Sequence, residues 1–444
     1  MTAPLLPSSV RWRIVWLLVG FSLVSYVERM NISVAAKFFA PELSLDQVQL
    51  GQIFSAFVLG YAALQIPMGM LADRIGPYRL LSVLGWLWAL LTMATGVLPG
   101  WLTGPGAPAF VTLVAIRFVL GLTIAGVYPL CARTTANWMP TAERAFAYSL
   151  VIAGVSIGSA LTPPLVAWLM TAIGWRESFY LTAVPGVLIS LLWMRLGADH
   201  PGRHRGISEL ERDYIVQGQG KQAAAPAAMA TWLALLRNRS LLLLAVSYFF
   251  IGYVLYVFVF WFYTYLVDVR KFGIVGSGFF TSLPFIVAFI LSPIGGKTCD
   301  ALTARYGTRT GRRATAMIGV LLAATCLLVG VRTEQAYLAV AALSLAFGLQ
   351  MFAESAYWSS AMDIAGRGTG AAGGLINTVN NLGGVVSTAL TPVLIERFGW
   401  TTAFNVCVGV SVVAALLWLG IRADQTIGAG GAAASPMNRA GVRA

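Results

Sequence analysis

Apolar stretches of about 20 residues recur along nearly the whole chain, and this repetition is the strongest constraint on its fold. A helix needs about 20 mainly apolar residues to cross the hydrocarbon core of a bilayer. Hydrophobic residues make up 58% of the 444 positions and charged residues only 11%, whereas a typical soluble domain carries roughly 25% charged residues. The sequence therefore predicts an all-α polytopic membrane protein.

Twelve transmembrane helices are expected, six on each side of a hydrophilic interval. The first apolar segment is too long for a signal-peptide core and shows no small-residue cleavage site, so we expect it to be retained. The expected spans are 13–37, 46–71, 80–99, 108–137, 142–170, 177–197, 239–268, 274–298, 313–331, 335–362, 367–395 and 401–422.

These spans divide the chain into five parts. A cytoplasmic N-terminal segment (1–12) precedes the first six-helix bundle (13–197). A cytoplasmic linker (198–238), partly an amphipathic helix near Ser208, leads to the second bundle (239–422). The Gly- and Ala-rich C-terminal tail (423–444) is expected to be disordered and cytoplasmic.

The distribution of basic residues predicts the orientation. If the N-terminus is cytoplasmic, 22 of the 30 Lys and Arg residues lie on the cytoplasmic side and six lie outside. Lys and Arg concentrate in cytoplasmic loops of membrane proteins, so we expect both termini inside. This bias also accounts for the net charge of +13, and binding to nucleic acid is not expected.

The four cysteines and two histidines show no pattern that indicates chemistry. The cysteines are scattered without metal-ligand spacing, and the histidines share one hydrophilic loop. Neither a metal site nor a nucleophile–base pair can be assembled, so no cofactor and no enzymatic activity are expected. These residues are Cys131, Cys299, Cys326, Cys407, His200 and His204.

The two halves of the chain resemble each other. A parallel six-plus-six repeat around a central linker predicts two pseudo-symmetric six-helix bundles that rock about a site at the membrane midplane. At an offset of 225 residues, Gly158, Gly174, Trp175 and Phe179 recur as Gly383, Gly399, Trp400 and Phe404. At an offset of 227 residues, Gly69 and Asp73 recur as Gly296 and Asp300.

Two adjacent charges, Glu28 and Arg29, interrupt the first apolar segment. Charged residues at membrane depth are costly and almost always face a cavity, a partner or a substrate path. Tyr26 and Arg29 fall on one polar stripe of a helix, and a guanidinium fork fits a carboxylate of a substrate. The alternative is an arginine that is buried against a carboxylate elsewhere in the protein.

A second intramembrane arginine, Arg117, lies in the fourth span. Tyr128 follows eleven positions later, within about 20° of Arg117 on a helical wheel, so both are expected to face one cavity. Two arginines without an anion would repel, which favours an anionic substrate with Glu28 or Glu354 as internal counter-charge. A permanent Arg–Glu pair is the alternative.

Several motifs resemble those of a known family. Residues 69–79 (GMLADRIGPYR) are similar to the loop signature of the major facilitator superfamily. Residues 26–31 (YVERMN) resemble the helix 1 motif of its anion:cation symporter branch, which includes bacterial galactonate and hexuronate transporters and vesicular glutamate and sialic acid carriers. The resemblance covers about residues 12–422. Further matches lie at 117–121, 261–266, 358–365 and 373–384.

The resemblance implies a secondary transporter that imports a small organic anion, a sugar acid or related carboxylate, by alternating access with proton symport. Relatives often carry a glutamate seven residues after the helix 4 arginine, but this chain has Ile124. Proton coupling then falls to Glu28 or Glu354, and a proton-independent facilitator or anion exchanger is the alternative. Drug efflux and a non-transporting sensor are less favoured, the former because helix 5 lacks the Gly-Pro-x-x-Gly-Gly element.

Substrate contacts and gates are expected at family positions. Most of the aromatic stripe in the seventh span is typical of packing, but Tyr253 or Tyr256 is expected to line the site. The short loop after helix 1 favours a bacterial plasma membrane protein. A monomer is expected, with protons and lipid as further partners. The expected substrate-binding residues are Tyr26, Arg29, Arg117, Tyr128, Tyr253, Tyr256, Trp358 and Asn377. The expected cytoplasmic gating residues are Asp73, Arg74, Arg79, Asp300 and Arg305.

Overall fold

The computed structural model describes residues 9–219, 235–366 and 369–427, apart from the side chains of Asp73, Ala142 and Ala145. All regular elements in these ranges are helices. Eleven of them are long and apolar enough to cross a membrane. The longest, α15 (Thr369–Leu417), is broken at Gly399, where φ is 81°, so it contains the last two expected spans. The predicted all-α polytopic architecture is confirmed.

The remaining helices follow the predicted order. Short helical turns at Leu98–Leu102 and Pro201–Arg203 lie between them. The helices are α1 (Val10–Glu42), α2 (Gln47–Ile75), α3 (Pro77–Val97), α4 (Ala107–Ile124), α5 (Val127–Trp138), α6 (Thr141–Ile173), α7 (Trp175–Leu196), α8 (Glu209–Gly218), α10 (Arg239–Phe260), α11 (Phe262–Asp268), α12 (Ile274–Tyr306), α13 (Thr308–Arg332) and α14 (Ala336–Ala365).

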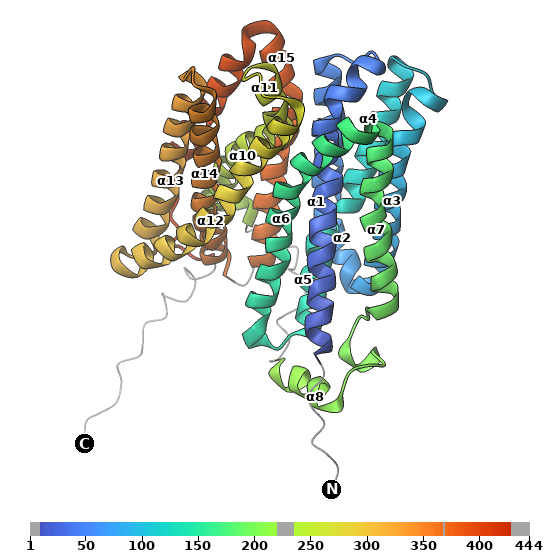
Figure 1. The fold of residues 1–444 in the computed structure, drawn as a ribbon. Helices are drawn as coiled ribbons and strands as arrows, with labels where there is room; N and C mark the ends of the chain where they lie inside the picture. The colour runs from blue at the N-terminus through green and yellow to red at the C-terminus, as the bar shows by residue number, and fades with distance from the viewer. Residues whose placement is uncertain (1–8, 220–234, 367–368, 428–444) are drawn as a thin grey trace, which may run out of the picture.

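The two halves of the chain form two bundles that stand side by side (Figure 1). The first bundle contains α1 to α7 and the second contains α10 to α15. They meet where α2 packs against α15 and where α6 packs against α12. Inside the bundles, α1 packs on α6 as α10 packs on α15, and α2 packs on α4 as α12 packs on α14. These matching pairs show the pseudo-symmetry that the sequence repeat predicts.

Two of the repeated glycines explain why these helix pairs lie so close. A Cβ atom at Gly158 of α6 would lie 2.7 Å from the carbonyl oxygen of Leu23 in α1. A Cβ atom at Gly383 of α15 would lie 2.0 Å from the carbonyl oxygen of Phe249 in α10. Small residues allow the backbones of membrane helices to approach closely, so glycine recurs at matching points of the two bundles.

Two spans that we expected to be continuous helices are interrupted. The fourth is divided into α4 and α5 at Ala125 and Gly126, and the seventh is divided into α10 and α11 at Trp261. A helical wheel assigns directions only along an unbroken helix. Ala125 and Gly126 keep helical backbone angles, so the interruption after α4 does not by itself change the directions that the wheel assigns to Arg117 and Tyr128.

The described first part of the hydrophilic interval (residues 198–219) packs onto the end of the first bundle where α1 begins, and Figure 1 shows α8 there. Ser208 caps α8 by accepting a hydrogen bond from the Glu211 amide at 3.2 Å. The fully buried Glu211 carboxylate accepts hydrogen bonds from the amides of Val10 and Arg11, both at 3.0 Å. These bonds satisfy donors that a helix start leaves without partners, so α8 is attached to α1. The expected disordered tail lies mainly outside the described residues.

Candidate functional site

Arg29 lies at the junction of the two bundles. Its side chain comes from α1 and is only 5% exposed. The guanidinium carbon lies 4.7–5.4 Å from the ring centres of Tyr26, Phe57, Tyr61 and Tyr256. Aromatic faces attract a cation at such distances. Within the described residues Arg29 forms no ion pair, so the structure does not support the alternative in which a protein carboxylate holds it.

A chain of hydrogen bonds runs from Arg29 across the junction. Arg29 Nη2 donates to the hydroxyl of Tyr256 in α10, and that hydroxyl donates to Oδ1 of Asn381 in α15 at 2.6 Å. Asn381 Nδ2 donates back to Oε1 of Gln65 in α2 at 3.4 Å. Four helices from both bundles therefore meet at one polar centre.

Arg29 and Tyr256 also occupy corresponding positions in the two repeats. Both lie three residues after the tyrosines Tyr26 and Tyr253, which themselves lie near the matching glycines of α6 and α15. Residues related by a pseudo-twofold axis touch each other only close to that axis. The bond between Arg29 and Tyr256 therefore places the polar centre near the axis, where the substrate sites of such repeat transporters lie.

Arg117 lies inside the first bundle rather than at the junction. It is 1% exposed, and its Nη1 and Nη2 donate to the Glu28 carbonyl oxygen at 3.0 Å and to Asn31 Oδ1 at 2.9 Å. Tyr128 in α5 instead neighbours Tyr26, Tyr61 and Arg29, and its buried hydroxyl has no hydrogen-bond partner in the described residues. The structure thus does not bring Arg117 and Tyr128 to one cavity.

Glu28 is fully buried, and neither carboxyl oxygen has a hydrogen-bond partner in the part of the chain that the structure describes. The carboxyl group packs on α7, where a Cβ atom at Gly186 would lie 2.7 Å from Oε1. Arg117 is its neighbouring cation, yet the two side chains form no direct salt bridge. An ionised carboxylate without donors is costly in an apolar interior, whereas the neutral acid is tolerated.

Glu354 in α14 has a different environment. Its Oε1 accepts hydrogen bonds from the Tyr248 hydroxyl at 2.7 Å and from Trp358 Nε1 at 3.4 Å. The carboxyl group of Glu354 therefore has the donors that Glu28 lacks. Glu354, Trp358 and Asn377 are half-buried, and the Asn377 carbonyl accepts a bond from the central Asn381 at 2.7 Å.

Tyr253 and the expected gating residues lie away from the polar centre. The Tyr253 hydroxyl is buried inside the second bundle, near Cys407 and Thr391. The Asp73 side chain lies outside the described residues. Arg74 and Arg79 are exposed. In the second bundle, Asp300 pairs with Arg312 at 3.3 Å, and Arg305 lies over the Tyr306 ring.

The bundles contact each other closely at the end where α1 finishes and α2 begins, which we call the closed end. Here Lys37 of α1 pairs with Asp268 of α11, with Nζ 2.6 Å from Oδ2. Phe54 of α2 stacks on Phe260 of α10 at 4.9 Å between ring centres. Among the described residues, Lys37–Asp268 is the only ion pair that joins the two bundles. The expected gating residues lie at the opposite end.

Sequence reasoning missed Tyr61, Gln65 and Tyr248, which contribute to this site. Tyr61 and Gln65 lie one helical turn apart in α2, so a polar face in the second apolar segment was the available signal. Tyr248 lies within an aromatic-rich span, where nothing in the sequence separates it from packing residues. Asn381 bonds between helices, to Tyr256 of α10 and Gln65 of α2.

A buried arginine that forms no ion pair among the described residues lies between two pseudo-symmetric helical bundles, which is the arrangement of a two-bundle membrane transporter. Sequence comparison agrees with that class. The Major Facilitator Superfamily profile matches residues 17–388 and 301–441, and the chain belongs to this family. It is therefore a multi-pass membrane protein.

Curated relatives cover most of the chain. A probable sulfoacetate transporter of Cupriavidus necator is 34% identical and covers 85% of each protein. A probable galactarate/D-glucarate transporter of Bacillus subtilis is 29% identical, over 92% of this chain and 91% of the relative. A D-galactonate transporter of Escherichia coli is 28% identical, over 90% and 93% respectively.

The solved structure of a bacterial homolog of the human lysosomal transporter Spinster shares the fold. It superposes with a TM-score of 0.77 at 17% identity and covers 94% of this chain and 98% of its own.

Proposed function

We propose that this protein imports a small organic anion, a sugar acid or related carboxylate, by alternating access coupled to proton symport. The observation that carries the proposal is Arg29, which is buried at the junction of the bundles without a carboxylate partner among the described residues. The names of the relatives, which include transporters of galactarate/D-glucarate and D-galactonate, support the substrate class.

The acid group of the substrate would bind the guanidinium of Arg29 in place of the Tyr256 hydroxyl. A carboxylate can accept two parallel hydrogen bonds from a guanidinium, which a single hydroxyl cannot. The half-buried Glu354, Trp358 and Asn377 offer acceptors and donors to hydroxyl groups on the rest of the molecule. Because Arg117 is engaged inside the first bundle, the junction supplies one arginine for one acid group.

Glu28 would carry the coupled proton. Among the described residues it is the buried carboxyl group without hydrogen-bond donors, and it is adjacent to Arg29 in the chain. Ile124, which cannot titrate, is also buried, so this part of α4 contributes no further carboxyl group. If Glu28 carries no proton, a proton-independent facilitator or exchanger is the second candidate.

The contacts between the bundles indicate which state the structure represents. With both termini inside, as the distribution of Lys and Arg predicts, the closed end lies on the outer face of a bacterial plasma membrane. The described state would then be open toward the cytoplasm. The outward-open state would require separation of Lys37 from Asp268 and of Phe54 from Phe260.

The test is binding and transport by the purified full-length protein. Sulfoacetate, D-glucarate and D-galactonate are screened by thermal shift and then by counterflow in proteoliposomes. Arg29→Gln should weaken binding of the active anion roughly 10- to 100-fold, the range for losing a hydrogen bond to a charged group. Arg29→Lys should retain part of the affinity because the charge remains.

Arg332→Gln is the matched control, since Arg332 is exposed at the end of α13 and should leave affinity unchanged. Wild-type affinity in a folded Arg29→Gln variant would refute the site assignment. Transport of cations or neutral compounds, with none of the three acids bound, would refute the substrate class.

A further inference from the structure

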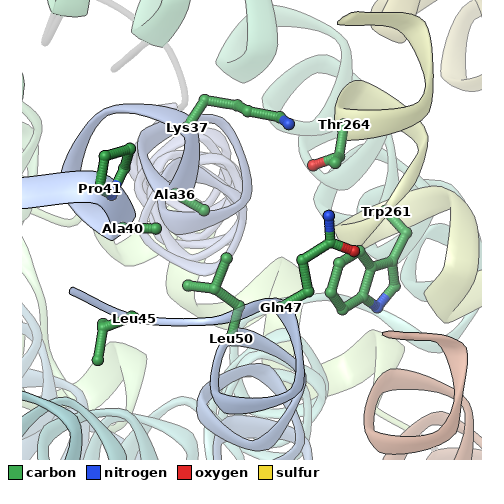
Figure 2. Close-up of a pocket in the computed structure, with 9 residues that line it drawn as sticks. All are labelled: Ala36, Lys37, Ala40, Pro41, Leu45, Gln47, Leu50, Trp261 and Thr264. Carbon is green, nitrogen blue, oxygen red and sulfur yellow. The ribbon is translucent and has the colours of Figure 1, made fainter. Parts of the chain in front are cut away.

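A cavity of about 170 Å³ lies between the bundles at the closed end. Most of its wall is apolar and comes from α1 and α2, with Trp261 on the side of the second bundle (Figure 2). One buried water needs only about 15 Å³ of such space, so the cavity has room for a small organic molecule. It is separate from the polar centre around Arg29, since the two share no lining residue.

Three polar side chains point into this space. Figure 2 shows the Lys37 ammonium extending toward Thr264, with the amide of Gln47 directed toward the same region. Gln47 Oε1 is buried and has no hydrogen-bond partner in the described residues, and Thr264 is 6% exposed. The cavity therefore offers one cationic donor and two further polar groups within an apolar wall, a composition that suits an acid head group on a small carbon skeleton.

The Lys37 ammonium in this cavity already pairs with Asp268, but both side chains are partly exposed to solvent. The side chains of Lys37 and Asp268 retain 24% and 31% of their exposure. Ion pairs with this much solvent contact contribute little net stabilisation. An incoming carboxylate can therefore compete with Asp268 for the ammonium group, and Thr264 and Gln47 can donate to its oxygens.

We propose that this cavity is a second, outer binding site for the acid group of a small carboxylate, which replaces Asp268 on Lys37. The inference rests on the proposed transport of organic anions and adds a site to it. Because Lys37–Asp268 joins the two bundles, occupation of this site also removes that link. Arrival of the anion from outside thereby removes one contact that holds the closed end together before the anion reaches Arg29, and this weakens the closed end by no more than the small contribution of such a pair.

The test measures binding of acetate, the smallest probe that carries the acid group, by saturation-transfer NMR on the full-length protein in detergent. All variants carry Arg29→Gln, so that the central site does not contribute. In this background, Asp268→Asn should tighten acetate binding about two- to fivefold, because it removes a weak competitor for Lys37. Lys37→Gln should abolish measurable binding, and Gln47→Leu should weaken it.

The opposite effects of Lys37→Gln and Asp268→Asn distinguish an anion site from a simple latch, because both changes break the same ion pair. Equal acetate affinities in these two variants would overturn the inference, as would no acetate binding in Arg29→Gln alone. Thermal unfolding verifies that each variant is folded. Loss of binding at Arg29 tests the proposed function separately, so either hypothesis can fail without the other.

Discussion

Replacing Glu28 by glutamine removes the buried carboxyl group that has no hydrogen-bond donor. Glutamine has nearly the same size, so the space against Gly186 of α7 stays filled, but its amide cannot bind or release a proton. Arg29 directs its guanidinium to Tyr256 and the surrounding rings, away from this carboxyl. The change should therefore uncouple transport from protons while substrate binding persists.

The size of the effect follows from the number of protons that one carboxyl can carry. A pH difference of one unit corresponds to about 1.4 kcal/mol per proton, or a tenfold concentration ratio. Symport of one proton with one monoanion is electroneutral, so the wild-type protein should accumulate substrate up to about tenfold per pH unit. The Glu28→Gln variant should only equalise the concentrations, with counterflow exchange close to that of the wild-type protein.

The assay is uptake into proteoliposomes with an imposed pH difference, followed by counterflow without one. Glu354→Gln is the matched control, because the Glu354 carboxyl has two donors and should affect substrate affinity rather than coupling. The reasoning is wrong if Glu28→Gln still accumulates substrate with the pH difference. It is also wrong if Glu354→Gln, and not Glu28→Gln, loses accumulation.

Three further substitutions test the structure itself. Tyr256→Phe removes the hydroxyl that links the bundles and should lower the free energy of unfolding by about 1–3 kcal/mol, measured by chemical unfolding in detergent. Unchanged stability would contradict the chain of hydrogen bonds from Arg29 to Gln65. Gly383→Ala places a methyl group against the Phe249 carbonyl and should lower the free energy of unfolding by about 1–3 kcal/mol, measured in the same way. Unchanged stability would contradict the close packing of α10 on α15. Glu211→Ala removes the cap of α1 and should speed amide exchange in its first turn, at a loss of about 1–2 kcal/mol; unaltered exchange would exclude the attachment of α8.

The fold could be predicted from the sequence because its main determinants are local. Each span is long and apolar enough to be recognised alone, and the recurrence of Gly158 as Gly383 marked two matching halves. The breaks at Gly126 and Trp261 were not predicted, since both lie inside continuous apolar stretches. A helix can break there because its neighbours pack around the interruption, and that packing is not encoded within the stretch itself.

The candidate site could be predicted only in part. Arg29 and Tyr256 were identified by polarity and position, but their contact depends on how two distant helices face each other. For Arg117, the helical wheel pointed to a shared cavity, whereas the side chain turns to Asn31 and the backbone of Glu28. The direction of a long side chain follows its hydrogen-bond partners, and these become apparent only in the folded bundle.

The separation of the two arginines has a consequence for coupling. In the part of the chain that the structure describes, the hydrogen-bond partners of Arg117 and the helix packed against the Glu28 carboxyl belong to the first bundle, so their surroundings would move together when the bundles rock. Arg29 bonds across to the second bundle, so its surroundings must change in the same motion. In the proposed mechanism the proton site and the anion site are therefore linked through α1, where Glu28 and Arg29 are adjacent.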